Sequence, residues 1–144
     1  MWQYEHSIET DAIPASIWHL YSDVSTWPGW DAGIAEIAID GPFAAGTTGT
    51  MTPAGQTSLA FRIVEAEPDL GFADETEIPD AGIVLRFTHR IATLPDGRTR
   101  LTHSVAMSGP GAEALGPRMG PGITDGIPQA MATLAQQAAA RDGR

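Results

Sequence analysis

The sequence predicts an α+β fold that combines an antiparallel β-meander with a long C-terminal helix. Two observations carry most of this prediction. Seven segments show strand-like patterning, and no crossover helix separates the last six of them. Helical periodicity then returns near the C-terminus. Strands that follow one another without a crossover helix pair antiparallel, so we expect one antiparallel sheet of about seven strands.

The first strand is predicted over residues 2–10, "WQYEHSIET", because apolar and polar residues alternate strictly there. Residues 11–24 then show helical spacing with a proline in the first turn, and "STWPGWDAG" ends this helix. The remaining strands, separated by turn residues, are predicted at 34–40, 46–52, 57–67, 71–78, 82–93 and 98–108.

The C-terminal segment is rich in glycine and proline, which is typical of a loop. Apolar residues nevertheless recur there at intervals of four: Leu115, Met119, Ile123, Ile127 and Met131. An amphipathic helix keeps that spacing and a loop has no reason to. We therefore expect one helix from about 112 to 140, kinked at Pro117, Pro121 or Pro128.

Composition narrows the function classes. The 144 residues form one expected domain, 1–144, with a net charge of −10 and no cysteine, so disulfides and thiolate metal sites are excluded. All the basic residues are arginines, and acidic residues precede their one local concentration, so we expect no nucleic-acid partner. No apolar run is long enough to span a membrane, and the acidic N-terminus does not resemble a secretory signal. We expect a cytoplasmic location.

Three stretches connect the sequence to a known family. "SDVSTWPGWDAGI" is similar to a helix-to-strand passage, "DGPFAAGTTGTM" to the turn that follows, and "DGRTRLTHSVAMSGPGAEAL" to a last strand that enters a long helix. Together they resemble the START-like (Bet v 1-like, SRPBCC) superfamily, in its polyketide cyclase/dehydrase-like branch. The resemblance implies a helix-grip fold: a curved sheet wrapped around a long C-terminal helix, short helices between strands 1 and 2, and an elongated ligand cavity between sheet and helix.

The strand register places histidines on the inner face. If the turn at 94–98 pairs Thr93 with Thr99, then His89 lies opposite His103 and Phe87 opposite Val105. Pairing Ile78 with Ile83 likewise brings Asp74 opposite Phe87 and Phe72 opposite His89. In the family the first strand lies beside the last, so the resemblance adds His6 next to His103.

Three interpretations of these histidines remain open. His89 and His103 are candidate catalytic residues, because imidazole can act as a general acid and base near neutral pH. They are also interpretable as structural histidines that hydrogen-bond each other, water or Asp74, and we favour this interpretation because buried polar groups usually satisfy one another. Three imidazoles including His6 can also hold zinc, but no sequence-local ligand motif supports this, and we expect neither a metal nor a cofactor.

The predicted ligand-binding residues are those expected to face the cavity. They are His6, Asp74, Trp27, Met51, Phe61, Phe87, Met119, Ile123 and Ile127. The "WPGW" turn containing Trp27 is also interpretable as packing, and the methionines as core. In a helix-grip fold the core face and the cavity face are the same surface.

Two functions follow from the resemblance. The first is binding of a small hydrophobic or aromatic ligand, lipid-like or polyketide-like, between the sheet and the C-terminal helix. The alternative is a polyketide cyclase/dehydratase-like enzyme that uses the pocket histidines. Relatives orient a polyketide with a pocket arginine and tyrosine, whereas here Arg62 falls on the outward phase and Tyr4 is the only strand tyrosine. No nucleophile, oxyanion or nucleotide motif is present, so we favour binding.

Overall fold

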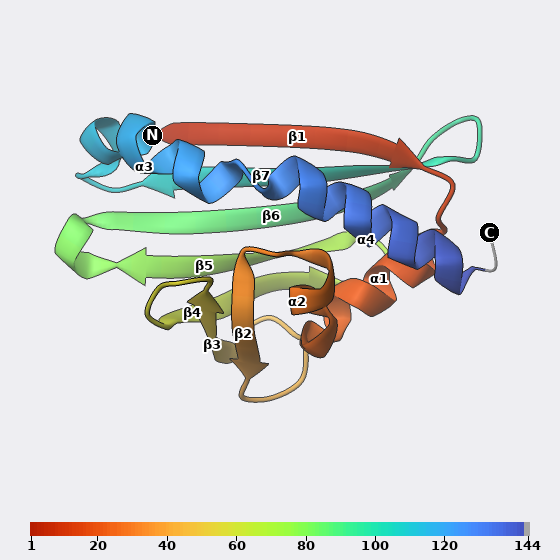
Figure 1. Ribbon diagram of the computed structural model, residues 1–144, viewed down its shortest axis with the longest axis horizontal. Helices are drawn as coiled ribbons and strands as arrows, with labels where there is room; N and C mark the ends of the chain where they lie inside the picture. The colour runs from red at the N-terminus through yellow and green to blue at the C-terminus, as the bar shows by residue number, and fades with distance from the viewer. Residues whose placement is uncertain (143–144) are drawn as a thin grey trace.

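The computed structural model describes residues 1–142 and forms one antiparallel sheet in the order β1-β7-β6-β5-β4-β3-β2 (Figure 1). Within these residues there are seven strands, as predicted. Their bounds are β1 Trp2–Thr10, β2 Ile34–Ile39, β3 Thr48–Pro53, β4 Leu59–Glu67, β5 Gly71–Ile78, β6 Ile83–Thr93 and β7 Thr99–Ser108. Strands β2 to β7 form the expected meander, and β1 pairs with β7 at the edge.

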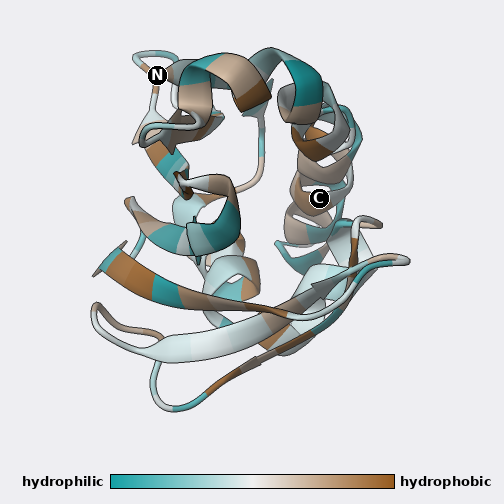
Figure 2. Cartoon of the chain, turned by 90° about the vertical axis from the view of Figure 1, so that its left-hand side faces the viewer, coloured by the Kyte–Doolittle hydropathy of each residue, from teal (hydrophilic) through white to brown (hydrophobic). Residues whose placement is uncertain are grey.

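The helices lie mainly at two places in the chain. Helix α1 (Pro14–Ser22), the 3₁₀ turn η1 (Val24–Thr26) and helix α2 (Trp27–Trp30) connect β1 to β2, and the 3₁₀ turn η2 (Pro79–Ala81) connects β5 to β6. Helices α3 (Ala112–Thr124) and α4 (Ile127–Arg141) follow β7. Figure 2 shows the helices on the concave side of the curved sheet. No helix within residues 1–142 is both long and apolar enough to cross a membrane.

The predicted C-terminal helix is confirmed, and its break falls at Asp125–Gly126. Pro128 lies in the first turn of α4, where its missing N–H is tolerated and its fixed φ suits a helix start. Pro117 and Pro121 remain inside α3. The helix therefore restarts next to Pro128, the last of the three prolines at which a kink was expected.

Helix α3 packs on the sheet through small residues rather than through its apolar stripe. Ala112, Gly116, Gly120 and Thr124 are its buried residues. The indole ring of Trp2 lies against both glycines, so a methyl group added at either position would overlap it. The predicted stripe of Leu115, Met119 and Ile123 lies on the adjacent side of the helix and is only half-buried.

Two apolar clusters occupy opposite ends of the sheet. The α4 cluster is centred on buried side chains of α1, β5, β7 and α4: Ile17, Tyr21, Phe72, Leu101, Met131 and Leu134. The α3 cluster contains Ile83, Leu85, Val105, Met107 and Ala112. Half-buried Ile127, the first residue of α4, contacts both clusters. The boundary between the clusters therefore lies beneath the break between α3 and α4.

The end of α4 holds the start of α1 in place. The Asp142 carboxylate accepts hydrogen bonds from the Ile13 backbone N–H, at 2.8 Å, and from the Ser16 hydroxyl. The first N–H groups of a helix have no intrahelical partner, so this carboxylate caps α1 from a distant part of the chain. The position of α1 on the sheet is thereby linked to that of α4.

Arginines on the outer face of the sheet are paired with carboxylates. Arg86 bonds to Glu75 and Glu65, both at 3.0 Å, and Arg90 bonds to Glu65 at 2.9 Å. Exposed pairs of this kind contribute at most about 1 kcal/mol each. They do neutralise much of the positive charge on which a nucleic-acid surface would depend.

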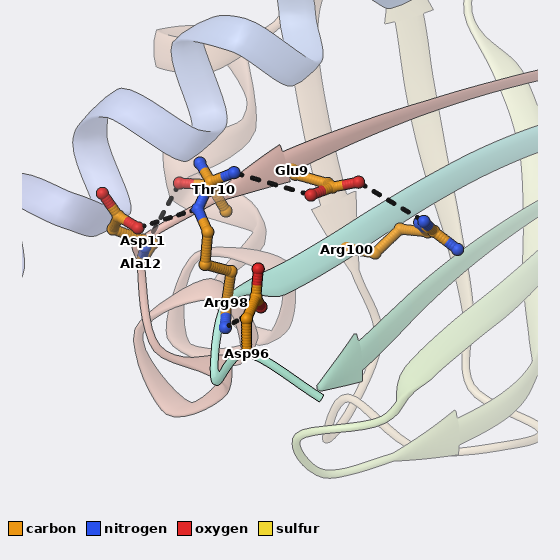
Figure 3. Close-up of polar contacts among 7 residues, drawn as sticks. All are labelled: Glu9, Thr10, Asp11, Ala12, Asp96, Arg98 and Arg100. Carbon is orange, nitrogen blue, oxygen red and sulfur yellow. Dashed lines mark hydrogen bonds and ion pairs between the residues drawn. The ribbon is translucent and has the colours of Figure 1, made fainter. Parts of the chain in front are cut away.

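A second group of paired arginines joins the β6–β7 turn to the link between β1 and α1 (Figure 3). Arg98 bonds to Asp11 at 2.9 Å and to Glu9 at 3.5 Å, and Arg100 bonds to Glu9 at 3.3 Å. The backbone N–H of Arg98 also donates to Asp96 within the turn. These contacts fix the turn that sets the β6–β7 register.

Candidate functional site

A row of ring side chains crosses the inner face of the sheet and begins at Phe72 of the α4 cluster. Phe72 pairs with His89, His89 with His103, and His103 with His6, on β5, β6, β7 and β1 in turn. This is the register predicted from the β6–β7 turn and from the family resemblance. Residues directly opposite one another in a sheet share a face, so these side chains all point to the concave side.

The adjacent row on the same face is Asp74, Phe87, Val105 and Tyr4. Asp74 also pairs with Ile63 of β4, which is fully buried. Asp74 and His89 are diagonal neighbours on adjacent strands, a relation that places Cβ atoms roughly 7–8 Å apart. The two rows together bring the predicted His6, Asp74, Phe87, His89 and His103 into one region.

Aromatic contacts hold His89 and His103 rigidly. The rings of Phe72 and His89 are stacked, with centroids 4.0 Å apart and planes 7° apart. The His89 and His103 rings meet edge to face, with centroids at 4.5 Å and an interplanar angle of 72°. Tyr21 packs against Phe72, His89 and His103, with ring centroids at 5.0, 5.6 and 5.8 Å.

Tyr21 is the site residue that sequence reasoning missed. Its hydroxyl lies 2.7 Å from Nε2 of His103, and its side chain is completely buried. Tyr21 belongs to the buried face of α1 with Ile17 and Leu20, and the Trp27 indole N–H donates to the Tyr21 backbone carbonyl at 3.0 Å. Helical spacing from Ile17 predicts that Tyr21 faces inward, but it does not indicate which strand residue lies beneath it.

The hydrogen bond indicates which tautomer His103 adopts. Burial raises the pKa of the Tyr21 hydroxyl, so this group keeps its proton. No other acceptor for it is present among residues 1–142, so donation to His103 Nε2 avoids a buried, unpaired O–H. The neutral His103 ring then carries its proton on Nδ1, which leaves an N–H donor on the other side of the ring.

Both central imidazoles are neutral near pH 7. Burial, and to a lesser extent the charge of His6, lowers the pKa of His103 to about 3. Burial, followed by the neighbouring His103, also places the pKa of His89 well below its usual range. An imidazole with so low a pKa is a weak general base, although its N–H remains a hydrogen-bond donor. Nδ1 of His89 is buried and has no hydrogen-bond partner in the described chain.

Asp74 behaves in the opposite way. Only 7% of its surface is exposed, and burial raises the pKa of its carboxyl to about 7. The positive charge of Arg86 partly opposes this change, and Glu75 adds to it. Arg86 and Glu75 both lie on the outer face, where they bond to each other. The Asp74 carboxyl therefore has a pKa matched to proton transfer at neutral pH, unlike the buried imidazoles of His89 and His103.

The other predicted ligand-binding residues are distributed more widely. Trp27 is buried against Trp30 and Phe72 in the α4 cluster, with ring centroids at 5.8 and 5.6 Å, which corresponds to the packing interpretation. Met51 pairs with Ile37 and Leu59 on the β2–β4 side of the sheet and is half-buried.

Phe61 pairs with Gly49 on the same side of the sheet and is buried. The predicted helix residues Met119, Ile123 and Ile127 are half-buried and pack at the edge of the α3 cluster, as does Phe87. Half-exposed apolar side chains from both sheet and helix therefore border the space in front of the inner rows.

Two depressions of the surface lie elsewhere. They have volumes of about 430 and 490 Å³, are open and lie over β1 and β7, and the first extends onto β6. Most of their lining residues, such as Glu5, Arg86 and Ser104, belong to the outer face. Neither depression is lined by residues of the C-terminal helices, where the elongated cavity was expected. Residues 1–142 contain no group of three or more His, Asp or Glu side chains arranged to hold a metal ion.

A family model described as "Polyketide cyclase / dehydrase and lipid transport" matches residues 1–139. The comparison with curated proteins gave no significant match.

Three similar solved structures illustrate the fold. Norcoclaurine synthase from Thalictrum flavum has a TM-score of 0.71 and 19% identity, over 93% of this chain and 84% of that one. Ara h 8.0201 has a TM-score of 0.76 and 13% identity, over 96% and 97%. The di-domain ARO/CYC StfQ from the steffimycin biosynthetic pathway has a TM-score of 0.74 and 13% identity, over 99% and 52%. At these identities the similarity concerns the fold alone.

Proposed function

Since the chain belongs to the polyketide cyclase/dehydrase and lipid transport family, we propose that it binds a small hydrophobic or aromatic ligand between the curved sheet and the C-terminal helices. One observation carries this proposal. Phe87, Tyr4 and His6 face the concave side of the sheet, and Ile123 and Ile127 lie on the helices, yet all five remain half-exposed. Partly exposed apolar and aromatic side chains that gather on facing elements are typical of a ligand-binding groove.

The polar groups of the two inner rows give this space its selectivity. Ligand sites are mostly apolar and contain a few polar groups that fix the orientation of the ligand. Here the polar groups are the imidazoles of His6, His89 and His103 and the Asp74 carboxyl. The hydrogen bond from Tyr21 supports a role for His103 as an oriented N–H donor.

Fluorescence of N-phenyl-1-naphthylamine, a neutral apolar probe, tests the binding proposal. The probe should brighten on binding to the natural protein. Ile127→Trp places an indole where the two clusters meet and should abolish the increase, whereas Gln129→Trp, at an exposed position of the same helix, should retain it. Equal binding by both variants, with circular dichroism showing that both are folded, would contradict the proposed location.

The alternative is a cyclase/dehydratase-like enzyme in which His89 and His103 transfer protons. The close contact of their rings supports it, but both imidazoles have depressed pKa values. If His89→Ala and His103→Ala bind a polyketide-like β-dicarbonyl substrate normally but lose its turnover, the enzyme is favoured. Absence of turnover in the natural protein together with binding favours the binding role.

A further inference from the structure

Asp74 is a buried acid without a hydrogen-bond or ion-pair partner among residues 1–142. Among residues 1–142 it is the only aspartate or glutamate that is buried, and its carboxyl makes no hydrogen bond or ion pair with any described residue. Its strand neighbour Glu75, on the outer face, is bonded to Arg86. Among residues 1–142, Nδ1 of His89 is the only side-chain nitrogen or oxygen that is fully buried and has no hydrogen-bond partner. The Asp74 oxygens also have no partner, but they are not fully buried. They therefore still reach accessible space.

No arginine of the described residues faces that space. The sequence contains no lysine. The strand arginines Arg62, Arg86, Arg90 and Arg100 occupy outward positions, Arg98 lies in the β6–β7 turn, and Arg118 and Arg141 are exposed on the helices. The buried imidazoles of His89 and His103 are neutral near pH 7 because burial disfavours their protonated forms. Among the described residues, the inner face at this point therefore offers one acidic group, the imidazoles of His6, His89 and His103, and no arginine or lysine.

The residues around Asp74 fit a ligand that joins a cationic group to an apolar body. Phe87 lies directly opposite it, Phe72 lies two residues before it on the same face of β5, and Ile63 flanks it on β4. A carboxylate removed from water requires a hydrogen-bond donor, and a charged donor compensates it best. Aromatic ring faces also attract a cation placed over them.

We propose that Asp74 binds the protonated amine of a ligand whose apolar, aromatic body fills the space between the sheet and the C-terminal helices, and that this site rejects carboxylates and phosphates. An anionic head group would meet Asp74 without a compensating cation and would lose its hydration on entry. This inference rests on the proposed ligand-binding function and specifies its ligand class. It disfavours fatty acids and phospholipids as ligands.

Three probes with the same ring system test the inference: 2-(2-naphthyl)ethylamine, 2-(2-naphthyl)ethanol and 2-naphthylacetate. Their dissociation constants are measured by isothermal titration calorimetry at pH 8, where the alkylamine is still protonated. The amine should bind about tenfold or more tightly than the alcohol, as expected for a hydrogen bond between charged groups. The carboxylate should bind more weakly than the alcohol.

Two variants assign the preference to Asp74. Asp74→Asn keeps the shape of the side chain and should bring the amine and the alcohol to within about twofold of each other, with the alcohol unchanged. Glu77→Gln removes an exposed carboxylate from the same strand and should leave the preference intact.

The outcomes separate this inference from the function on which it rests. If the alcohol and N-phenyl-1-naphthylamine bind but the amine binds no more tightly, the inference is overturned and the binding function stands. The inference is also overturned if Asp74→Asn keeps the amine preference or if the carboxylate binds as tightly as the amine. If neither the naphthyl probes nor N-phenyl-1-naphthylamine bind, both proposals fail.

Discussion

Replacing Asp74 with asparagine should stabilise the protein at neutral and alkaline pH. Burial raises the pKa of the carboxyl from 3.8 to about 7, so the folded protein holds this proton more tightly than the unfolded chain does. Ionisation therefore costs stability. This loss of stability is absent below pH 3.8, grows as the pH rises from 3.8 to about 7, and is complete above about pH 7.

The size of the effect follows from the two pKa values. Each unit of difference corresponds to about 1.4 kcal/mol, so ionised Asp74 destabilises the fold by about 4 kcal/mol. This is a large part of the 5–15 kcal/mol that typically stabilises a folded protein. Asparagine has nearly the same shape and no charge, so Asp74→Asn should recover most of this energy at pH 8. At pH 5 the stabilisation by Asp74→Asn should be about 3 kcal/mol smaller than at pH 8.

Urea denaturation of the natural protein and the variant at pH 5 and pH 8 provides the measurement. The buried histidines destabilise both proteins as the pH falls below 6.5, so the difference between the two proteins isolates Asp74. Glu77→Gln serves as the control and should show no such pH-dependent difference. A variant that is less stable than the natural protein at both pH values, or a difference that does not change with pH, would refute the reasoning.

Three further substitutions test the packing of the helices on the sheet. Tyr21→Phe leaves Nε2 of His103 buried without a partner and should cost about 1–3 kcal/mol in the free energy of unfolding by urea; a loss below about 0.5 kcal/mol would contradict the hydrogen bond. Gly120→Ala should lower the melting temperature despite the better helix propensity of alanine, because its methyl group overlaps Trp2. Gly122→Ala, which meets no neighbouring atom, should instead stabilise α3 by about 0.5–1 kcal/mol, and equal effects of the two alanines would be inconsistent with this packing.

The sequence predicted the strand register well because that register depends on local rules. A turn at 94–98 and strict alternation suffice to place His89 opposite His103, and the structure has this pairing. The family resemblance supplied the pairing of β1 with β7, which alternation alone cannot give. Inward-facing residues on the strands were therefore predictable one by one.

Contacts between helix and sheet were less predictable. The hydrogen bond of Tyr21 to His103 depends on how α1 lies across the sheet, and helical spacing does not encode that position. In α3 the periodicity favoured burial of the stripe containing Met119, but the side with Gly116 and Gly120 packs on the sheet because Trp2 needs that space. The separation of sheet and helices depends on the same fit, so helical spacing alone could not predict the shape of a cavity between them.

The break at Asp125–Gly126 has a consequence for exchange of amide protons with solvent. Pro117 and Pro121 have no N–H groups, so α3 lacks two of the hydrogen bonds of an ordinary helix, whereas Asp142 links the end of α4 to α1. The two helices also pack on different apolar clusters. Segments with few such restraints open independently of the rest of a protein. We therefore expect α3 amides to exchange by local opening and α4 amides only with global unfolding, so that the inner face beneath α3 can become accessible while the α4 cluster stays folded.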